Sequence, residues 1–174
     1  MPYPAGTIGG AVGVVTRLLD ATNAHDLTSL TACFAADYVN DTPAHPLRSF
    51  AGRDQVRANW QQLFASIPDL RASIVGLAAD TADAADSADS ADRKGGPLDV
   101  DDPRSLVGDI VWTEWRLTGT RPDGSAHEMA GVILFTIRGT EIVHGTFYLE
   151  QVERGSGTVD DNIRRVTIGA RTPG

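Results

Sequence analysis

The sequence has one cysteine and no long apolar run. A single thiol, Cys33, excludes an intramolecular disulfide, a cysteine-built zinc site and a redox pair, and we expect it to be buried. No stretch reaches the ~18–20 apolar residues that a membrane span needs. The first residues also lack the basic start and the leucine-rich run of a secretory signal. We therefore expect a cytoplasmic protein that has no membrane partner.

Positive charge is scarce as well: the chain has 15 Lys and Arg against 23 Asp and Glu, a net charge of -8. Residues 80–102 alone carry -6, so the rest of the chain is close to neutral. There is no basic stripe of the kind that attracts phosphate groups. The composition therefore predicts no nucleic-acid partner.

The acidic stretch repeats Asp at every third position from Asp80 to Asp92 and has no large apolar side chain before Leu98. Such a segment buries too little to offset its ordering entropy, so we expect residues 80–104 to be a solvated insertion in a β-hairpin. A calcium loop is the alternative, but the spacing is not that of an EF-hand and the closing Glu is missing. Recruitment of a basic partner is another alternative. We predict no metal site.

Apolar positions recur at helical spacing within residues 8–24 and 52–67, and Asp26 can cap a short helix that runs to Phe34. Residues 70–78 alternate like a strand. Residues 107–153 contain three β-rich runs separated by two turn signals, which predicts an antiparallel meander.

This order predicts one α+β domain over residues 1–174, with a core at about 8–153 and a tail at 155–174 that contains one short helix at 159–166. Helices on one face of a curved sheet leave a pocket between the two layers. We expect the Trp115 face of strand 110–118 to form the pocket wall, whereas the opposite orientation would place Glu114 inside.

Five motifs carry a family resemblance: NAHDL at 23–27, FAADYV at 34–39, GRD at 52–54, IPDL at 67–70, and WRLTGT at 115–120 followed by Asp123-Gly124. Together they resemble the SnoaL-like branch of the nuclear transport factor 2 superfamily, over about residues 8–153. The resemblance implies a cone-shaped, curved antiparallel sheet packed on three helices, and a homodimer formed through the outer sheet face. That superfamily includes polyketide cyclases, ketosteroid isomerases, limonene epoxide hydrolases and non-catalytic pockets.

The resemblance also assigns residues. The general base of the isomerases matches Asp41, whereas their oxyanion-hole Tyr falls at Leu18. The Arg and two Asp of the epoxide hydrolases fall near Trp115, Leu117 and Phe147. Matching the alternation of the last strand to those enzymes places Phe147 inside the pocket. The acid/base Asp of the cyclases is matched by Phe147 or, with a shift, by Glu150.

Two polar residues are the candidate catalytic groups. Asp41 in an apolar pocket would have a raised pKa and could remove a proton next to a carbonyl; the alternative is an exposed Asp that bonds its own turn. His45 could be its acid/base partner or line the pocket mouth, or it could be a surface loop residue. His127 and His144 have no ligand partner at zinc spacing.

The sequence thus predicts a cofactor-free protein with a pocket for a small apolar molecule. The activity would be that of a polyketide cyclase or an isomerase, by proton transfer next to a carbonyl, with Asp41 and His45 as the catalytic groups. The alternative is a non-catalytic binding module. The predicted ligand-contacting residues are Tyr38, Trp60, Phe64, Trp115, Met129 and Phe147.

Overall fold

The computed structural model describes residues 10–80, 108–154 and 157–168. The predicted insertion, apart from Asp80, lies outside the described residues. The elements, in chain order, are α1 (Ala11–Ala24), α2 (Leu27–Thr31), β1 (Phe34–Asp41), η1 (Pro46–Arg48), β2 (Phe50–Ala51), α3 (Arg53–Ser66), β3 (Arg71–Asp80), β4 (Asp109–Thr120), β5 (Ala126–Arg138), β6 (Glu141–Gln151) and α4 (Val159–Ile168).

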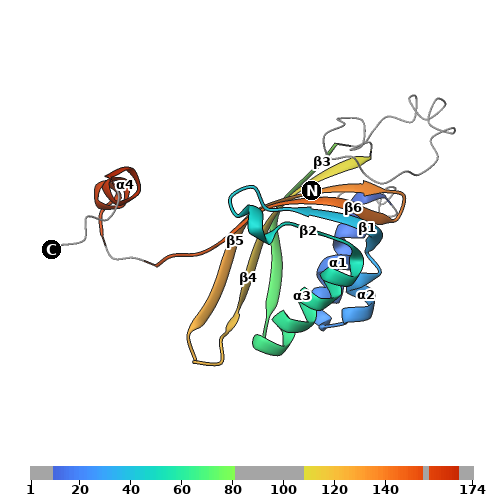
Figure 1. Cartoon of the computed structure of the whole chain (residues 1–174), viewed down its shortest axis with the longest axis horizontal. Coiled ribbons are helices and arrows are strands. Elements are labelled where there is room, and N and C mark those ends of the chain that lie inside the picture. The colour runs from blue at the N-terminus through green and yellow to red at the C-terminus, as the bar shows by residue number, and fades with distance from the viewer. Residues whose placement is uncertain (1–9, 81–107, 155–156, 169–174) are drawn as a thin grey trace, which may run out of the picture.

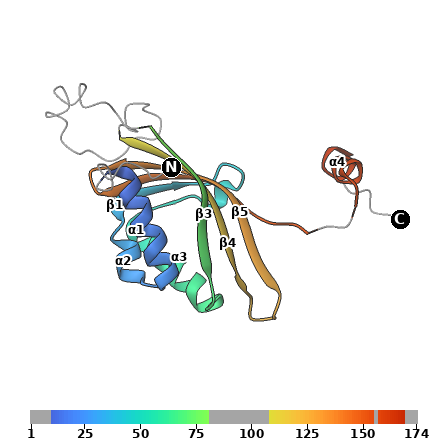
Figure 2. The same ribbon diagram turned by 180° about the vertical axis from the view of Figure 1, so that it is seen from behind.

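One six-stranded, curved sheet forms the body, in the order β2-β1-β6-β5-β4-β3. Helices α1, α2 and α3 all pack on one side of it, and α4 stands apart from the body in both views (Figures 1 and 2). The predicted α+β class and the predicted meander β4-β5-β6 are confirmed. Every strand pairing is antiparallel except that of β1 with β6, which is parallel.

Helix α1 covers the sheet with one apolar stripe. Val14, Val15 and Leu18, at helical spacing, are almost completely buried in the core. The helix ends at His25, whose backbone is left-handed and whose Nε2 lies 2.9 Å from the carbonyl oxygen of Leu70. The Asn23 side chain then exchanges two hydrogen bonds with the backbone of Ala72 on β3. The helix end is therefore tied to the edge strand of the sheet.

The two faces of the sheet differ sharply along β4. Val111, Thr113, Trp115 and Leu117 are buried toward the helices, and the residues between them point away. This is the orientation in which Trp115 faces inward and Glu114 faces outward. A strand with one buried face and one open face follows directly from this period-two alternation.

Candidate functional site

A cavity of about 240 Å³ lies between α3 and the concave side of the sheet. Its wall is mostly apolar or aromatic, from α3, β1, β2, β4, β5 and β6, with a few polar groups on β1, η1 and α3. The lining residues are Phe34, Tyr38, Asn40, Thr42, Arg48, Phe50, Val56, Asn59, Trp60, Leu63, Leu117, Met129, Phe147 and Leu149.

Three polar side chains follow one another on the inner face of β1 and its end. Tyr38, Asn40 and Thr42, here called the polar row, alternate with outward residues because successive side chains on a strand point to opposite faces. The Tyr38 hydroxyl donates to Asn40 Oδ1 at 3.1 Å, and Asn40 Nδ2 donates to Thr42 Oγ1 at 3.2 Å. Their exposures are only 1%, 6% and 7%. The row is therefore a buried, directional chain of hydrogen bonds.

The phenol of Tyr38 stays protonated in this setting. Burial, and secondarily the negative charge of Asp41, raise the pKa of Tyr38 far above its ordinary value. The ring has room because residue 145 is glycine: a Cβ added there would lie 2.5 Å from Tyr38 Oη. Tyr38 is thus a permanent donor at the inner end of the polar row.

The structure places the two predicted catalytic residues away from the cavity wall. Asp41 lies on the opposite side of β1 from the polar row, and its Oδ2 is 2.8 Å from Nε2 of the buried His144. His45 lies in the loop between Thr42 and Arg48, with Nε2 3.0 Å from Glu150 Oε2. Asp41 and His45 therefore do not pair with each other; each belongs to a separate pair of one carboxylate and one imidazole.

Four of the six predicted ligand contacts line the cavity: Tyr38, Trp60, Met129 and Phe147. Phe64 instead stacks on His25, with ring centroids 4.4 Å apart. Trp115 is buried in the core behind the wall and donates its indole N–H to Thr113 Oγ1 at 2.7 Å. Their ligand-contacting role stays a prediction.

Sequence reasoning missed Asn40, Thr42, Arg48 and Asn59. The signal for the first two was present, because a strand that turns Tyr38 inward must also turn Asn40 inward and Asp41 outward. For Arg48 and Asn59 there was none, since one follows an irregular loop and the other sits on the edge of a helix face.

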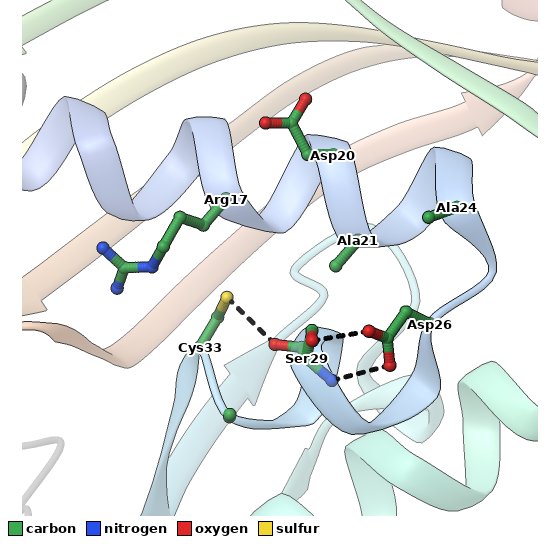
Figure 3. A pocket seen from close by; sticks show the side chains of 8 residues that line it. Arg17, Asp20, Ala21, Ala24, Asp26, Ser29 and Cys33 are labelled. Atoms are coloured by element: carbon green, nitrogen blue, oxygen red, sulfur yellow. Dashed lines mark hydrogen bonds between the residues drawn. The ribbon is translucent and has the colours of Figure 1, made fainter.

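A second hollow, of about 390 Å³, lies between α1 and α2 (Figure 3). Most of its polar side chains are already bonded: the Asp26 carboxylate accepts from the backbone N–H groups of Thr28 and Ser29, the Cys33 thiol donates to the Ser29 carbonyl oxygen, and Arg17 donates to the Thr140 carbonyl oxygen. Burial raises the pKa of the Cys33 thiol, which keeps it protonated and unreactive. This hollow is therefore not a candidate site.

Among the residues that the structure describes, no group of three or more His, Cys, Asp or Glu side chains is placed to hold a metal ion. No described helix is both long and apolar enough to cross a membrane.

The curved sheet with helices on one face is the α+β fold of solved proteins described as NTF2-like and ketosteroid isomerase-like. The family model of the SnoaL-like domain matches residues 15–103, just over half of the chain. The chain belongs to the SnoaL-like domain family. No protein among those with curated functions matches it.

Solved structures share the fold at low identity. A proposed aromatic ring hydroxylase from Novosphingobium aromaticivorans has a TM-score of 0.62 at 16% identity, covering 92% of this chain and 99% of that one. IdmH, a proposed polyketide cyclase from Streptomyces antibioticus, has a TM-score of 0.55 at 21% identity, covering 80% and 90%. A proposed isomerase from Bacillus subtilis has 0.56 at 14% identity, covering 80% and 86%. At these identities the likeness shows the fold alone.

Proposed function

We propose that the protein binds a small, largely apolar molecule in the cavity of about 240 Å³. The composition of the wall carries this proposal. Among the described residues that line the cavity, none is Asp, Glu or His, and most are apolar or aromatic. Such a wall stabilises a ligand by removing its apolar surface from water. Proton transfer next to a carbonyl needs a base within hydrogen-bond reach, and the described wall residues include no carboxylate or imidazole to serve as one, so binding is the function that the wall supports best.

Fluorescence of Trp60 tests the proposal, because Trp60 lines the cavity whereas Trp112 lies on the outer face of β4. Titration with isopropylbenzene, a neutral one-ring probe, is expected to change tryptophan emission saturably. The change should persist in Trp112→Phe and disappear in Trp60→Phe. If Trp112→Phe removes the signal and Trp60→Phe retains it, the probe binds on the outer face and the proposal is wrong.

A second candidate function is proton transfer next to a carbonyl, as in a polyketide cyclase or isomerase. One contact favours it: His45 pairs with Glu150 at 3.0 Å, in a loop bracketed by two residues that line the cavity. A carboxylate at Nε2 holds an imidazole in one orientation, as a general base requires.

Deuterium exchange into the methyl group of acetophenone measures this reaction. If His45 is the base, we expect the protein to accelerate exchange and His45→Gln to lower the rate about 100-fold, the scale of general-base catalysis. Loss of exchange in Asp41→Asn instead would support Asp41 as the base, as the family resemblance implies. Exchange at the buffer rate with the unaltered protein would leave binding as the function.

We further propose a homodimer formed through the outer sheet face. Trp112 and Tyr148 are 50% and 48% exposed there, and Glu114 and Arg116 lie beside them on β4. In a two-fold arrangement, the Glu114 of each copy can face the Arg116 of the other. Sedimentation velocity should give a dimer that Trp112→Glu dissociates, whereas Leu47→Glu, at an exposed site on η1, should not. A monomer at micromolar concentration would contradict the proposal.

A further inference from the structure

Thr42, Asn59 and Arg48 line the cavity, and each has a donor group that no hydrogen bond between described residues uses. In the polar row, Asn40 Oδ1 accepts from Tyr38 and Thr42 Oγ1 accepts from Asn40. The hydroxyl hydrogen of Thr42 is then left over, because none of the hydrogen bonds between described residues uses it as a donor. Thr42 is 93% buried and lines the cavity, so a molecule in the cavity is an available acceptor for this hydrogen. A buried donor of this kind is costly to leave unpaired.

Two further residues, at the cavity mouth, also have unused donors. Asn59 on α3 accepts from Gln55 Nε2 through its Oδ1 at 2.8 Å, which leaves its amide nitrogen free to donate. Arg48 on η1 also lines the cavity, and its guanidinium has no acceptor among the described residues. Three elements, β1, α3 and η1, thus present donors to one space, and one of these donors carries a positive charge.

The nearby acceptors are directed elsewhere. Asp41 and Glu150 lie on strands of the wall, but Asp41 points to the other side of β1 and pairs with His144, while Glu150 pairs with His45. A ligand with an acceptor group would therefore pair the unused donors, whereas a ligand with a donor group would meet only oxygen atoms of the row and would leave those donors unpaired.

From these unused donors we infer that the cavity selects molecules whose polar end accepts hydrogen bonds. Carboxylates attached to an apolar ring fit this description best. The carboxylate accepts from the Thr42 hydroxyl and the Arg48 guanidinium, and the ring packs on Trp60 and Phe147. This inference depends on the proposed binding function. The cavity volume, about 240 Å³, is the space of roughly eight liquid waters, which suits a body of one or two rings.

Three one-ring probes of matched shape test the selection: benzoate, isopropylbenzene and benzamidine. They place a negative acceptor, an apolar group and a positive donor on the same ring. Dissociation constants from Trp60 emission are expected to rank benzoate tightest, at least about tenfold below isopropylbenzene, and benzamidine weakest. Benzoate affinity should also fall with added salt, because Arg48 lies at the exposed mouth.

Two variants test whether Arg48 and Thr42 cause the preference for benzoate. Arg48→Gln and Thr42→Val are each expected to reduce the ratio of benzoate to isopropylbenzene affinity by about fivefold to tenfold. Arg164→Gln is the matched control, because it removes an exposed arginine from α4, which stands apart from the body. Equal weakening of both probes by Thr42→Val would indicate damage to the wall and would contradict a selective role for Thr42.

The two proposals can fail separately. If isopropylbenzene changes Trp60 emission but benzoate binds no more tightly, or benzamidine binds best, the inferred selection is wrong and the binding function stands. If none of the three probes changes Trp60 emission, the binding function itself is wrong.

Discussion

Replacing Gly131 by alanine is expected to lower the free energy of unfolding by about 3 kcal/mol, the scale of an overpacked, strained backbone site. Gly131 lies on β5 at φ +153°, opposite Trp115 on β4 and Leu149 on β6. An added Cβ would overlap the carbonyl oxygen of Tyr148, which is a backbone atom of the paired strand. The clash cannot be relieved by a side-chain rotation, so β5 and β6 would have to separate. Urea unfolding measures the change.

Gly124→Ala is the control for backbone conformation alone. Gly124 also has a positive φ, +81°, in the turn between β4 and β5, but a Cβ there meets nothing within 4 Å. Its substitution should cost about 1 kcal/mol, the penalty for a side chain in that region. Equal losses at both sites would contradict the close approach of β5 and β6.

Asn40→Leu is expected to lower the free energy of unfolding by about 2–3 kcal/mol, because it leaves buried donors and acceptors without partners. The phenol of Tyr38 is 1% exposed and would lose its acceptor, and Thr42 Oγ1 would lose its donor. The raised pKa of Tyr38 means that the phenol keeps the unpaired hydrogen at any ordinary pH. Urea unfolding again gives the value.

A double-mutant cycle isolates the bond between the two side chains. Tyr38→Phe removes the hydroxyl that Asn40→Leu leaves unpaired, so the double variant should be more stable than the sum of the two single losses by about 1–2 kcal/mol. Strictly additive losses would mean that Tyr38 and Asn40 do not interact, and the polar row would not be a continuous chain.

The meander β4-β5-β6 could be predicted because its information is local. Asp123 and Gly124 form the first turn, where the Asp123 side chain accepts from the backbone N–H of Ser125, and Gly139 supplies a positive φ in the second. The tail helix was equally local: Thr158 and Asp161 cap α4 by bonding each other's backbone N–H.

The parallel pairing of β1 with β6 was not predictable, because it joins Phe34 to Ile142 across more than a hundred residues. The same pairing shortens the second helix. It was expected to reach Phe34, but it ends at Thr31 because Phe34 already belongs to β1. Long-range pairing overrides the local helical pattern here.

The aromatic part of the candidate site could be predicted from the sequence, but the polar residue that β1 contributes could not. Which residues of β1 face the cavity depends on the position of the strand in the sheet. Tyr38 and Asp41 were both expected in the pocket, yet residues three apart on a regular strand face opposite sides. The structure turns Tyr38 inward, and with it Asn40, so the inner face of β1 carries an amide in place of a carboxylate. Because Asn40 and not Asp41 lines the cavity, the wall favours ligand binding over proton transfer.

The most direct test follows the three indole N–H signals in a ¹H–¹⁵N spectrum during titration with isopropylbenzene. Trp60 lines the cavity, Trp115 lies in the core behind it, and Trp112 is half-exposed on the outer face. Binding in the cavity should shift the indole signal of Trp60 most, together with the side-chain amide of Asn40, and should not shift that of Trp112. A shift of Trp112 with Trp60 unchanged would contradict it.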